Sequence, residues 1–339
     1  MYSIIRPILF RLDAETAHGI TFKLLEFARV IGLLELMILP PVGRPTEVMG
    51  IRFASRVGLA AGLDKDGEHV DALVECGFAF VEVGTVTPRP QPGNDKPRMF
   101  RVKSKRAIIN RMGFNNKGVD HLVEQVRERK NDCVLGVNIG KNKDTPNEKA
   151  LDDYIYCLRA AHEVADYIAV NISSPNTPGL RELQSKQELK ALITGLQAER
   201  DALTEKTGKR VPLAVKIAPD LTDDELKDMV LVFRLCKIDA VIATNTTNSR
   251  EGVEGERNAD EQGGLSGEPL RERSNTLLKR LIELLYGEIP VIAVGGVMSP
   301  ADAAEKIHLG AKLVQLYSGF IYSGPAIVSE AVTATNIDF

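Results

Sequence analysis

Eight short apolar segments that alternate with helical segments constrain the fold of this chain most strongly. The apolar segments are rich in β-branched residues, as buried strands are, and they cover residues 57–61, 79–83, 134–138, 167–171, 213–216, 240–244, 291–294 and 313–317. Between them lie segments with helical period or composition, at residues 66–75, 116–130, 151–164, 186–203, 223–236, 269–285 and 300–309. This alternation predicts an α/β protein with a (β/α)8 TIM barrel.

The main alternative is a doubly wound open sheet. Such a sheet normally has fewer strands, and a glycine fingerprint follows its first strand. The segment Gly58-Leu-Ala-Ala-Gly62 does not have that spacing. The barrel is therefore the favoured fold.

The first 40 residues differ from the rest and predict a helical extension. Asp13 is a candidate N-cap, and apolar residues with amphipathic spacing follow it, at Ala17, Ile20, Leu24, Phe27, Ala28 and Ile31. Pro40-Pro41 ends the segment. We therefore divide the chain into an N-terminal helical segment, residues 1–40, and a barrel, residues 41–339. The extension either packs on the barrel or serves as a membrane-surface or hydrophobic-ligand element.

Charge and cysteine usage exclude several classes of protein. The net charge of −3 and the pI near 6.1 argue against a nucleic-acid partner and against a polybasic membrane tether. The four cysteines form no CxxC pair, so neither a zinc site nor a disulfide framework is indicated, and a reducing, cytosolic setting is expected. No signal peptide or membrane-spanning run is visible. We expect a soluble protein, or one that lies on a membrane.

Polar residues at the ends of the eight predicted strands are the candidate site. In a barrel of this kind the chemistry lies at the carboxyl ends of the strands, so these residues should meet around one point. In strand order they are Ala61, Gly62, Leu63, Asp64 and Lys65, then Thr85, Asn138, Asn171, Lys216, then Thr244, Asn245 and Thr246, then Gly296, then Tyr317 and Ser318. The set holds two lysines, amides, hydroxyls and a single carboxylate.

This composition decides between reaction types. A metal-dependent hydrolase needs His, Asp or Glu ligands, but the five histidines lie in predicted helices or in the N-terminal segment. A glycosidase needs paired carboxylates at strand ends, and these are absent from the sequence pattern. No metal site is predicted. Amides with cations suit a polar, anionic heterocycle that is hydrogen-bonded along its edge.

Glycine turns after the last two strands indicate a phosphate site. Gly295-Gly296 and Ser318-Gly319 allow backbone N–H groups to approach a ligand closely, and barrels commonly bind phosphate at this position. Gly263-Gly-Leu-Ser-Gly267 is expected to add a third, flexible loop. Together these turns predict a phosphorylated cofactor or substrate.

The stretch Val170–Leu180 places a stiff polar loop after the fourth predicted strand. Pro175 and Pro178 restrict the backbone, so Ser174, Asn176 and Thr177 are presented in fixed positions. The stretch alone is compatible with an ordinary turn and with a binding site.

Lys216, which ends the fifth predicted strand, has three candidate roles. It could be a Schiff-base nucleophile, a structural ion-pair partner, or a fixed cation near a flavin pyrimidine ring. A nucleophilic lysine needs an apolar pocket, whereas the neighbouring strand ends carry amides and hydroxyls. The pattern favours the fixed cation.

The longest interruption of the alternation, residues 84–116, is the most basic part of the chain. Most of its lysines and arginines fit a solvated face. Arg111 differs, because it lies in Asn110-Arg-Met-Gly-Phe114, where amide, guanidinium and aromatic groups occur together.

Several motifs in this order resemble those of the class 2 dihydroorotate dehydrogenases of pyrimidine synthesis. They are Ala61-Gly-Leu-Asp-Lys65, Asn110-Arg-Met-Gly-Phe114, Val137-Asn-Ile-Gly140, Asn171-Ile-Ser-Ser-Pro-Asn-Thr-Pro-Gly-Leu180, Lys216-Ile-Ala-Pro219, Asn245-Thr, Gly263-Gly-Leu-Ser-Gly267 and Val294-Gly-Gly-Val297. The resemblance spans essentially the whole chain, including the N-terminal extension. It implies oxidation of (S)-dihydroorotate to orotate, with FMN as hydride acceptor and a membrane quinone as final electron acceptor.

The resemblance also implies roles for individual positions. The FMN positions are Ala61, Gly62, Leu63, Asp64, Lys65, Thr85, Asn138, Asn171, Lys216, Thr244, Gly267, Gly296, Tyr317 and Ser318. The substrate positions are Lys65, Asn110, Arg111, Met112, Gly113, Phe114, Asn171, Asn176, Asn245 and Thr246. The catalytic base is a serine in class 2 and a cysteine in class 1; the matching residue is Ser174, and no cysteine lies in its loop.

An unassisted serine is a poor base at neutral pH, so we expect a proton relay through Thr177 or ordered water. His18 and Arg101 match positions near the quinone head group. The resemblance further implies a monomer held peripherally by its N-terminal helices on the cytoplasmic face of the inner membrane.

Two other functions are open from the residues alone. One is a Schiff-base lyase or aldolase on the same barrel, with Lys216 or Lys65 as the nucleophile. The other is a non-catalytic membrane-surface protein that uses only its N-terminal helices, which leaves the polar strand ends unexplained.

Overall fold

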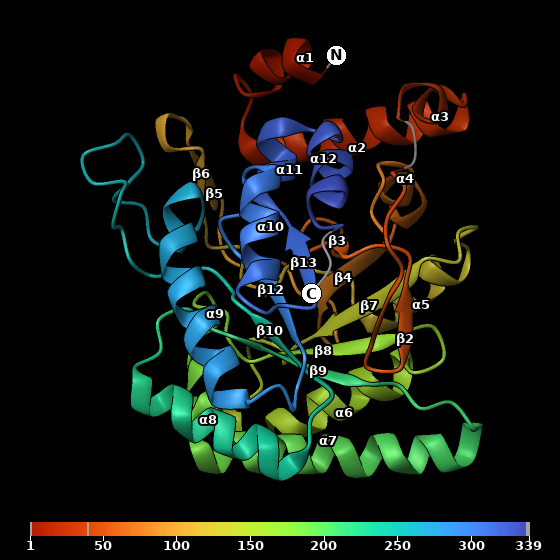
Figure 1. Ribbon diagram of the computed structural model, residues 1–339, viewed down its shortest axis with the longest axis vertical. Coiled ribbons are helices and arrows are strands. Elements are labelled where there is room, and N and C mark those ends of the chain that lie inside the picture. Colours follow the sequence, from red (N-terminus) through yellow and green to blue (C-terminus); the bar gives the residue numbers. More distant parts are fainter. Residues whose placement is uncertain (1, 39–40, 337–339) are drawn as a thin grey trace.

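Eight parallel strands form a closed barrel in the computed structural model, which describes residues 2–38 and 41–336 (Figure 1). In chain order they are β3 (Val57–Leu59), β4 (Phe80–Val86), β7 (Val134–Ile139), β8 (Tyr167–Asn171), β9 (Leu213–Ile217), β10 (Ala240–Ala243), β12 (Val291–Val294) and β13 (Leu313–Leu316). Each pairs with the next, and β13 pairs with β3 to close the ring. The predicted (β/α)8 barrel and all eight strand positions are confirmed.

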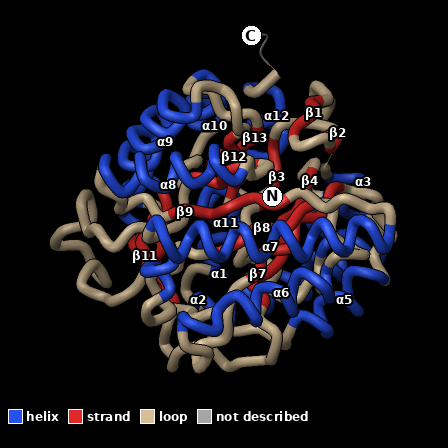
Figure 2. Tube along the Cα trace, turned by 90° about the horizontal axis from the view of Figure 1, so that it is seen from below, coloured by secondary structure: helices blue, strands red, loops and turns tan. Residues whose placement is uncertain are grey.

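Helices form an outer layer around the barrel (Figure 2). They are α4 (Val70–Glu75), α5 (Val119–Arg127), α6 (Ala150–Ala161), α7 (Lys186–Thr207), α8 (Asp223–Cys236), α9 (Arg271–Leu285), α10 (Pro300–His308), α11 (Ser318–Ser323) and α12 (Ala326–Ala334). Short 3₁₀ turns lie at η1 (Lys103–Lys105), η2 (Asn147–Lys149), η3 (Leu180–Gln184) and η4 (Glu268–Leu270).

Side-chain hydrogen bonds to the backbone account for where two of these helices begin. At α8, the Thr222 hydroxyl accepts from the Glu225 N–H, and the Glu225 carboxylate accepts from the Thr222 N–H, which makes a capping box. The helix therefore covers the predicted residues. By contrast, α4 starts at Val70, four residues later than predicted, because the Asp64 carboxylate accepts from the backbone N–H groups of Glu68 and His69.

The barrel interior is packed with side chains from alternate strand positions. Phe80, Tyr167 and Leu313 are fully buried there, and the hairpin of β1 (Thr46–Val48) and β2 (Ile51–Phe53) adds Phe53. The Phe53 and Phe80 rings meet edge to face, with 5.1 Å between their centroids. The interior is a core, so ligands are confined to the barrel's ends.

A three-stranded antiparallel sheet was not predicted. It consists of β5 (Met99–Val102), β6 (Ala107–Asn110) and β11 (Gly264–Gly267), in the order β11-β6-β5. Gly264–Gly267 was expected to be a flexible loop, and that expectation is wrong because these residues pair with β6 and are buried. The partner strands lie far apart in the sequence, so local patterns do not reveal the pairing.

The N-terminal segment folds into α1 (Tyr2–Leu9), α2 (Ala14–Val30) and α3 (Leu33–Met37), which lie beside α11 and α12 (Figure 1). The predicted N-cap is confirmed: Asp13 Oδ1 accepts from the N–H groups of Glu15 and Thr16, each at 3.0 Å. The predicted break at Pro40-Pro41 lies partly outside the described residues.

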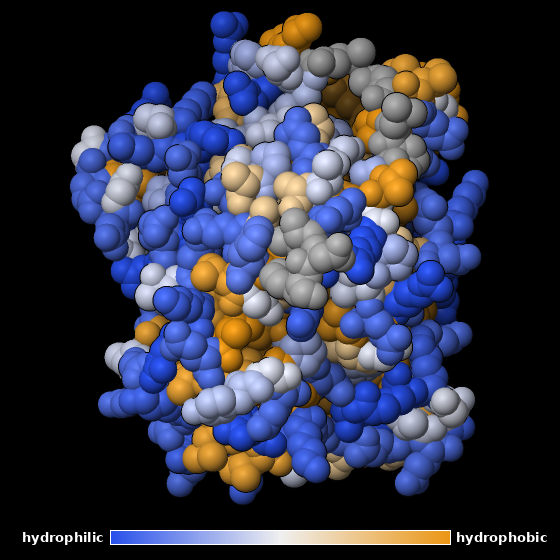
Figure 3. Space-filling model, viewed as in Figure 1, coloured by the Kyte–Doolittle hydropathy of each residue, from blue (hydrophilic) through white to orange (hydrophobic). Residues whose placement is uncertain are grey.

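Many apolar side chains of this segment are exposed, and Figure 3 shows hydrophobic surface over α3. The exposed set includes Ile4, Ile8, Leu24, Phe27, Val30, Ile31 and Leu36. Within the described residues, none of the helices combines the length and the apolar character that crossing a membrane requires.

Candidate active site

A polar cavity lies at the carboxyl ends of the barrel strands. The structure brings most of the predicted site residues together in its wall, namely Ala61, Gly62, Lys65, Thr85, Asn110, Met112, Gly113, Phe114, Asn171, Ser174, Asn176, Lys216, Thr244, Asn245, Thr246, Gly267, Gly296, Tyr317 and Ser318. Strand register explains part of this grouping. Asn171 on β8 pairs with Lys216 on β9, so the amide and the ammonium end neighbouring strands at the same height.

Several predicted residues do not line this cavity. Asp64 points to the start of α4, and burial raises the pKa of its carboxyl group. Leu63 faces a second, apolar cavity. Arg111 turns away toward Glu261, with 2.7 Å between Nη1 and Oε2, and its guanidinium lies over the Phe100 ring. The side chain of Arg111 therefore holds the outer loops together.

Asn138 lies just below the cavity, in a buried polar network. Its Oδ1 accepts from Thr85 Oγ1 at 2.6 Å and from Asn171 Nδ2 at 3.2 Å. Its Nδ2 donates to Glu82 Oε1 at 2.8 Å. Asn138 thus orients two side chains of the cavity wall from below.

Glu82 on β4 is the centre of this network, and the sequence analysis missed it. Its other oxygen accepts from Tyr167 Oη at 3.0 Å and from Gln315 Nε2 at 2.7 Å. Lys216 Nζ lies 3.7 Å from Glu82 Oε1, so the cavity cation has a buried counter-ion. A carboxylate inside the apolar run 79–83 was the available signal, because buried acids need partners.

Lys65 is a second cation in the cavity wall. Its Nζ donates to Asn115 Oδ1 at 2.8 Å. Burial and the nearby Arg98 lower its pKa to about 7, and Glu15 partly opposes that shift. An anionic ligand would favour the charged form of this lysine.

Ser174 lies in the loop after β8 and is buried in the cavity wall. Its Oγ accepts from the Asn176 N–H at 3.2 Å. The Thr177 hydroxyl is also buried, does not line the cavity, and has no hydrogen-bond partner among the residues that the structure describes. A buried hydroxyl of this kind needs a hydrogen-bond partner, and an ordered water is the usual one where the protein supplies none.

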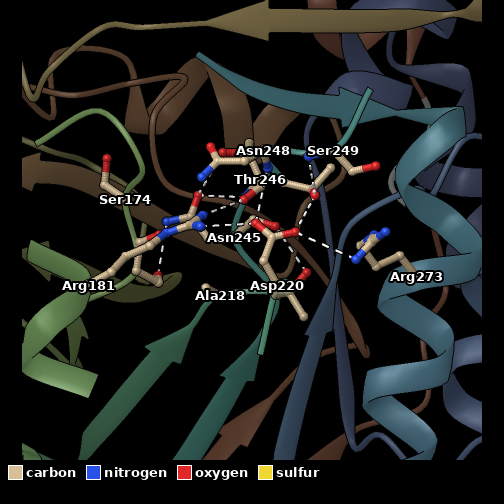
Figure 4. A network of polar contacts seen from close by, with 12 residues as sticks. Ser174, Arg181, Ala218, Asp220, Asn245, Thr246, Asn248, Ser249 and Arg273 are labelled. Atoms are coloured by element: carbon tan, nitrogen blue, oxygen red, sulfur yellow. Dashed lines mark hydrogen bonds and ion pairs between the residues drawn. The ribbon is translucent and has the colours of Figure 1, made fainter. Parts of the chain in front are cut away.

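Arg181 fastens this loop to the neighbouring strand ends, and the sequence analysis did not identify it. It donates from Nε to Ser173 O at 3.1 Å and from Nη2 to Thr246 O at 3.1 Å. Its Nη1 pairs with Asp220 Oδ2 at 3.0 Å. Figure 4 shows Arg181 and Arg273 on opposite sides of Asp220. One guanidinium thus sets the position of the Ser174 loop relative to Asn245 and Thr246.

The end of the cavity near β11, β12 and β13 fits a phosphate group. Gly267, Gly295 and Gly296 line it with positive φ angles of 96°, 107° and 75°. A side chain at Gly296 would lie 2.3 Å from Arg271 Cα, so only glycine fits this turn. The Ser266 and Ser318 hydroxyls, 2.9 Å apart, add donors. No acidic side chain lines the cavity within the described chain.

Further residues that line the cavity were not among the predicted site residues. They are Ala60, Ser266, Leu270, Val294, Val297 and Gln315. Their types are common in barrel strands, and only the closed ring brings them to this surface. Among the described residues, no cluster of three or more His, Cys, Asp or Glu side chains is arranged to hold a metal ion.

The second cavity is apolar and lies between α1, α2, α3, β5 and α11. Both residues predicted for a quinone head group, His18 and Arg101, line it. His18 Nε2 lies 2.7 Å from Leu63 O, and burial lowers the pKa of its ring. Tyr317 lines both cavities, so they are direct neighbours.

Comparison with known proteins supplies a family. The family model described as dihydroorotate dehydrogenase matches residues 45–335. Curated relatives from Ectopseudomonas mendocina (strain ymp) and Teredinibacter turnerae, both named dihydroorotate dehydrogenase (quinone), are 55% and 56% identical over 334 residues. Each alignment covers 98% of this chain and 98% of the relative.

Solved structures from Eimeria tenella are also similar. The crystal structure of DHODH in complex with ferulenol has a TM-score of 0.85 and 38% identity, covering 94% of this chain and 90% of that chain. The ligand-free structure has a TM-score of 0.84 and 39% identity, covering 93% of both chains.

Proposed function

The chain belongs to the dihydroorotate dehydrogenase family, in its quinone-dependent class 2. We propose that it oxidises (S)-dihydroorotate to orotate, with FMN as the bound flavin and a quinone as the final electron acceptor. It is thus an oxidoreductase and flavoprotein of pyrimidine biosynthesis. The observation that carries the proposal is the single polar cavity wall that combines a glycine-lined, acid-free end with amides, two lysines and Ser174.

The residues present fit FMN. Gly267, Gly296 and Ser318 line the end of the cavity and would hold the phosphate, and Lys216, paired with Glu82, would supply a fixed positive charge to the flavin. Further contacts would come from Ala61, Gly62, Thr85, Asn171, Thr244 and Tyr317, which line the cavity, while Asn138 orients Asn171 through a hydrogen bond. Bound FMN supplies a two-electron acceptor, and the protein supplies position and charge.

The substrate lies against the amides of the cavity in this proposal. Asn110, Asn171, Asn176 and Asn245, together with Thr246, donate and accept along its edge, and Lys65 balances its negative charge. Met112, Gly113 and Phe114 cover it. Arg111 contributes through its ties to Glu261 and not through a direct contact.

Ser174 takes a proton from the substrate. Its hydroxyl is buried and held by the Asn176 N–H, and Arg181 fixes its loop. The partner-free hydroxyl of Thr177 supports a relay through a bridging water, which would carry the proton onward. The nearby lysine and amides stabilise the charge that develops on the ring.

The N-terminal segment, residues 1–40, forms a unit apart from the barrel in this proposal. Its exposed apolar side chains rest on a membrane surface at the cytoplasmic face of the inner membrane, and the apolar cavity admits the quinone toward Tyr317. His18 and Arg101 lie where they can contact the quinone head group. The chain acts as a monomer.

An anaerobic spectrum tests the proposal. The purified protein should show a flavin absorption band that bleaches when dihydroorotate is added and returns when a quinone is added. A colourless protein that gains no band with FMN, or covalent trapping of substrate by borohydride, would favour the lyase instead. Lys216 lies 3.7 Å from the Glu82 carboxylate, among amides and hydroxyls, and not in the apolar pocket that a nucleophilic lysine needs.

A further inference from the structure

Lys306 is a buried lysine outside the cavity, and the proposed reaction gives it no role. It lies on α10 and is fully buried. Its Nζ donates to Ser274 Oγ at 2.7 Å and to Asn275 Oδ1 at 2.8 Å, both on the neighbouring helix α9. A buried ammonium is costly unless something nearby stabilises it.

The nearest carboxylates do not neutralise Lys306 directly. Asp302 and Glu305 face Arg271, with 2.9 Å from Nη1 to the Asp302 carboxylate and 3.4 Å from Nε to the Glu305 carboxylate. No ion pair to Lys306 occurs within the described part of the chain. Burial lowers its pKa to about 7, Glu305 and Asp302 oppose this shift, and Arg271 adds to it. An anion nearby would therefore favour the charged form of Lys306.

Ser274 connects this lysine to the glycine turn of the cavity. Ser274 Oγ donates to Gly295 O at 2.9 Å, while it accepts from Lys306. In a trans peptide, the carbonyl and the following N–H point in opposite directions. Because the Gly295 carbonyl points to α9, the Gly296 N–H points away from α9. That N–H has no acceptor among the described residues, and Gly296 lines the cavity.

We infer that Lys306 is a positioning residue for the phosphate of the flavin. Through Ser274 it fixes the Gly295-Gly296 peptide so that the Gly296 N–H faces the phosphate. Its buried positive charge favours the dianionic form of that phosphate. This inference rests on the proposed FMN site. In this role Lys306 acts on the cavity, whereas a purely structural lysine would only fill the polar gap between α9 and α10.

Two flavins that differ only in the phosphate test the inference. The full chain, freed of its flavin, is titrated with FMN and with riboflavin, and binding is followed by flavin fluorescence. The wild-type protein should bind FMN far more tightly. Lys306→Met should weaken FMN binding by about 10- to 100-fold, the range for hydrogen bonds to charged groups, and leave riboflavin binding within about twofold.

Ser274→Ala is the smaller change and keeps the test open if Lys306→Met does not fold. It should lower the preference for FMN over riboflavin in the same direction, by about threefold to tenfold. The control is Lys141→Met, which removes another buried ammonium, bonded to Thr145 O at 2.8 Å, and should leave the preference unchanged.

The outcomes separate the two proposals. Equal losses for both flavins, or an unchanged preference in Lys306→Met and in Ser274→Ala, would overturn the role of Lys306 while the FMN site stands. A wild-type protein that binds riboflavin as tightly as FMN would instead refute the phosphate site itself.

Discussion

The polar cavity and the apolar cavity share Tyr317 but are built in different ways. The polar cavity gathers side chains from the ends of hydrogen-bonded strands, and a buried network around Glu82 holds them from below. The apolar cavity lies among short helices with exposed apolar side chains. The polar cavity is therefore built on the closed barrel, whereas about half of the apolar cavity is built on N-terminal helices whose outer side chains are exposed.

A few polar contacts join the two regions. Glu15 on α2 pairs with Arg98 at 2.8 Å, and Arg98 Nη1 also donates to Asn94 O at 2.9 Å. Asn94 Nδ2 in turn donates to Asn176 O at 3.2 Å, within the Ser174 loop. The N-terminal helices are thus tied to the loop that carries Ser174 and not only to the outer surface of the barrel.

The largest effect is expected inside the polar cavity. Ser174→Ala removes the proposed base, so flavin reduction by dihydroorotate should slow by about 100- to 10,000-fold at neutral pH. Reoxidation of reduced flavin by quinone should be unchanged. Stopped-flow absorbance measures both steps. Ser249→Ala, in a nearby loop outside the cavity, is the control, and a near wild-type reduction rate in Ser174→Ala would remove the serine from the mechanism.

Removal of residues 1–40 tests the role of the apolar cavity. Quinone turnover should fall by at least about 100-fold, because the cavity proposed to admit the quinone loses about half of its lining. Anaerobic flavin reduction by dihydroorotate should survive, because the polar cavity is built on the barrel. Steady-state quinone assays and anaerobic spectra measure the two. Equal loss of both activities would mean that the segment only supports the fold.

Arg181 tests how the position of the Ser174 loop affects the polar cavity. Arg181→Gln removes three contacts that hold the Ser174 loop, and flavin reduction should slow by about 10- to 100-fold through misplacement of the base. Arg181→Lys should restore part of the rate. Arg159→Lys, which alters a surface pair with Glu199, is the matched control. A change in substrate affinity alone, at an unchanged limiting rate, would argue against a role in positioning Ser174.

The smallest effect is a pH dependence of ligand binding. The pKa of Lys65 is lowered to about 7, so its charge is present below that pH and is lost as the pH rises. The dissociation constant of orotate should therefore increase above pH 7, by at most about tenfold per pH unit. Equilibrium titrations from pH 6 to 9 measure this. In Lys65→Met, binding should be weaker and lose this dependence, whereas a pH-independent wild type would contradict the prediction.

Local patterns predicted the architecture well because the periodicity of strands and helices depends on residues that are close together in the sequence. The eight apolar runs and the Asp13 cap are of this kind, and the structure confirms both. Residue types at strand ends also predicted most of the cavity wall, because parallel strands in a barrel end at one face. The start of α4 was missed because the Asp64 side chain binds the N–H groups of Glu68 and His69, a contact that helical periodicity does not reveal.

The sequence by itself determined the barrel, the helical extension and the stiff loop that carries Ser174, since each depends on periodicity or on backbone restriction within a few residues. Only the tertiary structure decided that Arg111 turns outward, that Glu82 pairs with Lys216, and that Lys306 lies behind the glycine turn. Those relations join residues far apart in the chain, and they exist only once the ring has closed and its helices have packed.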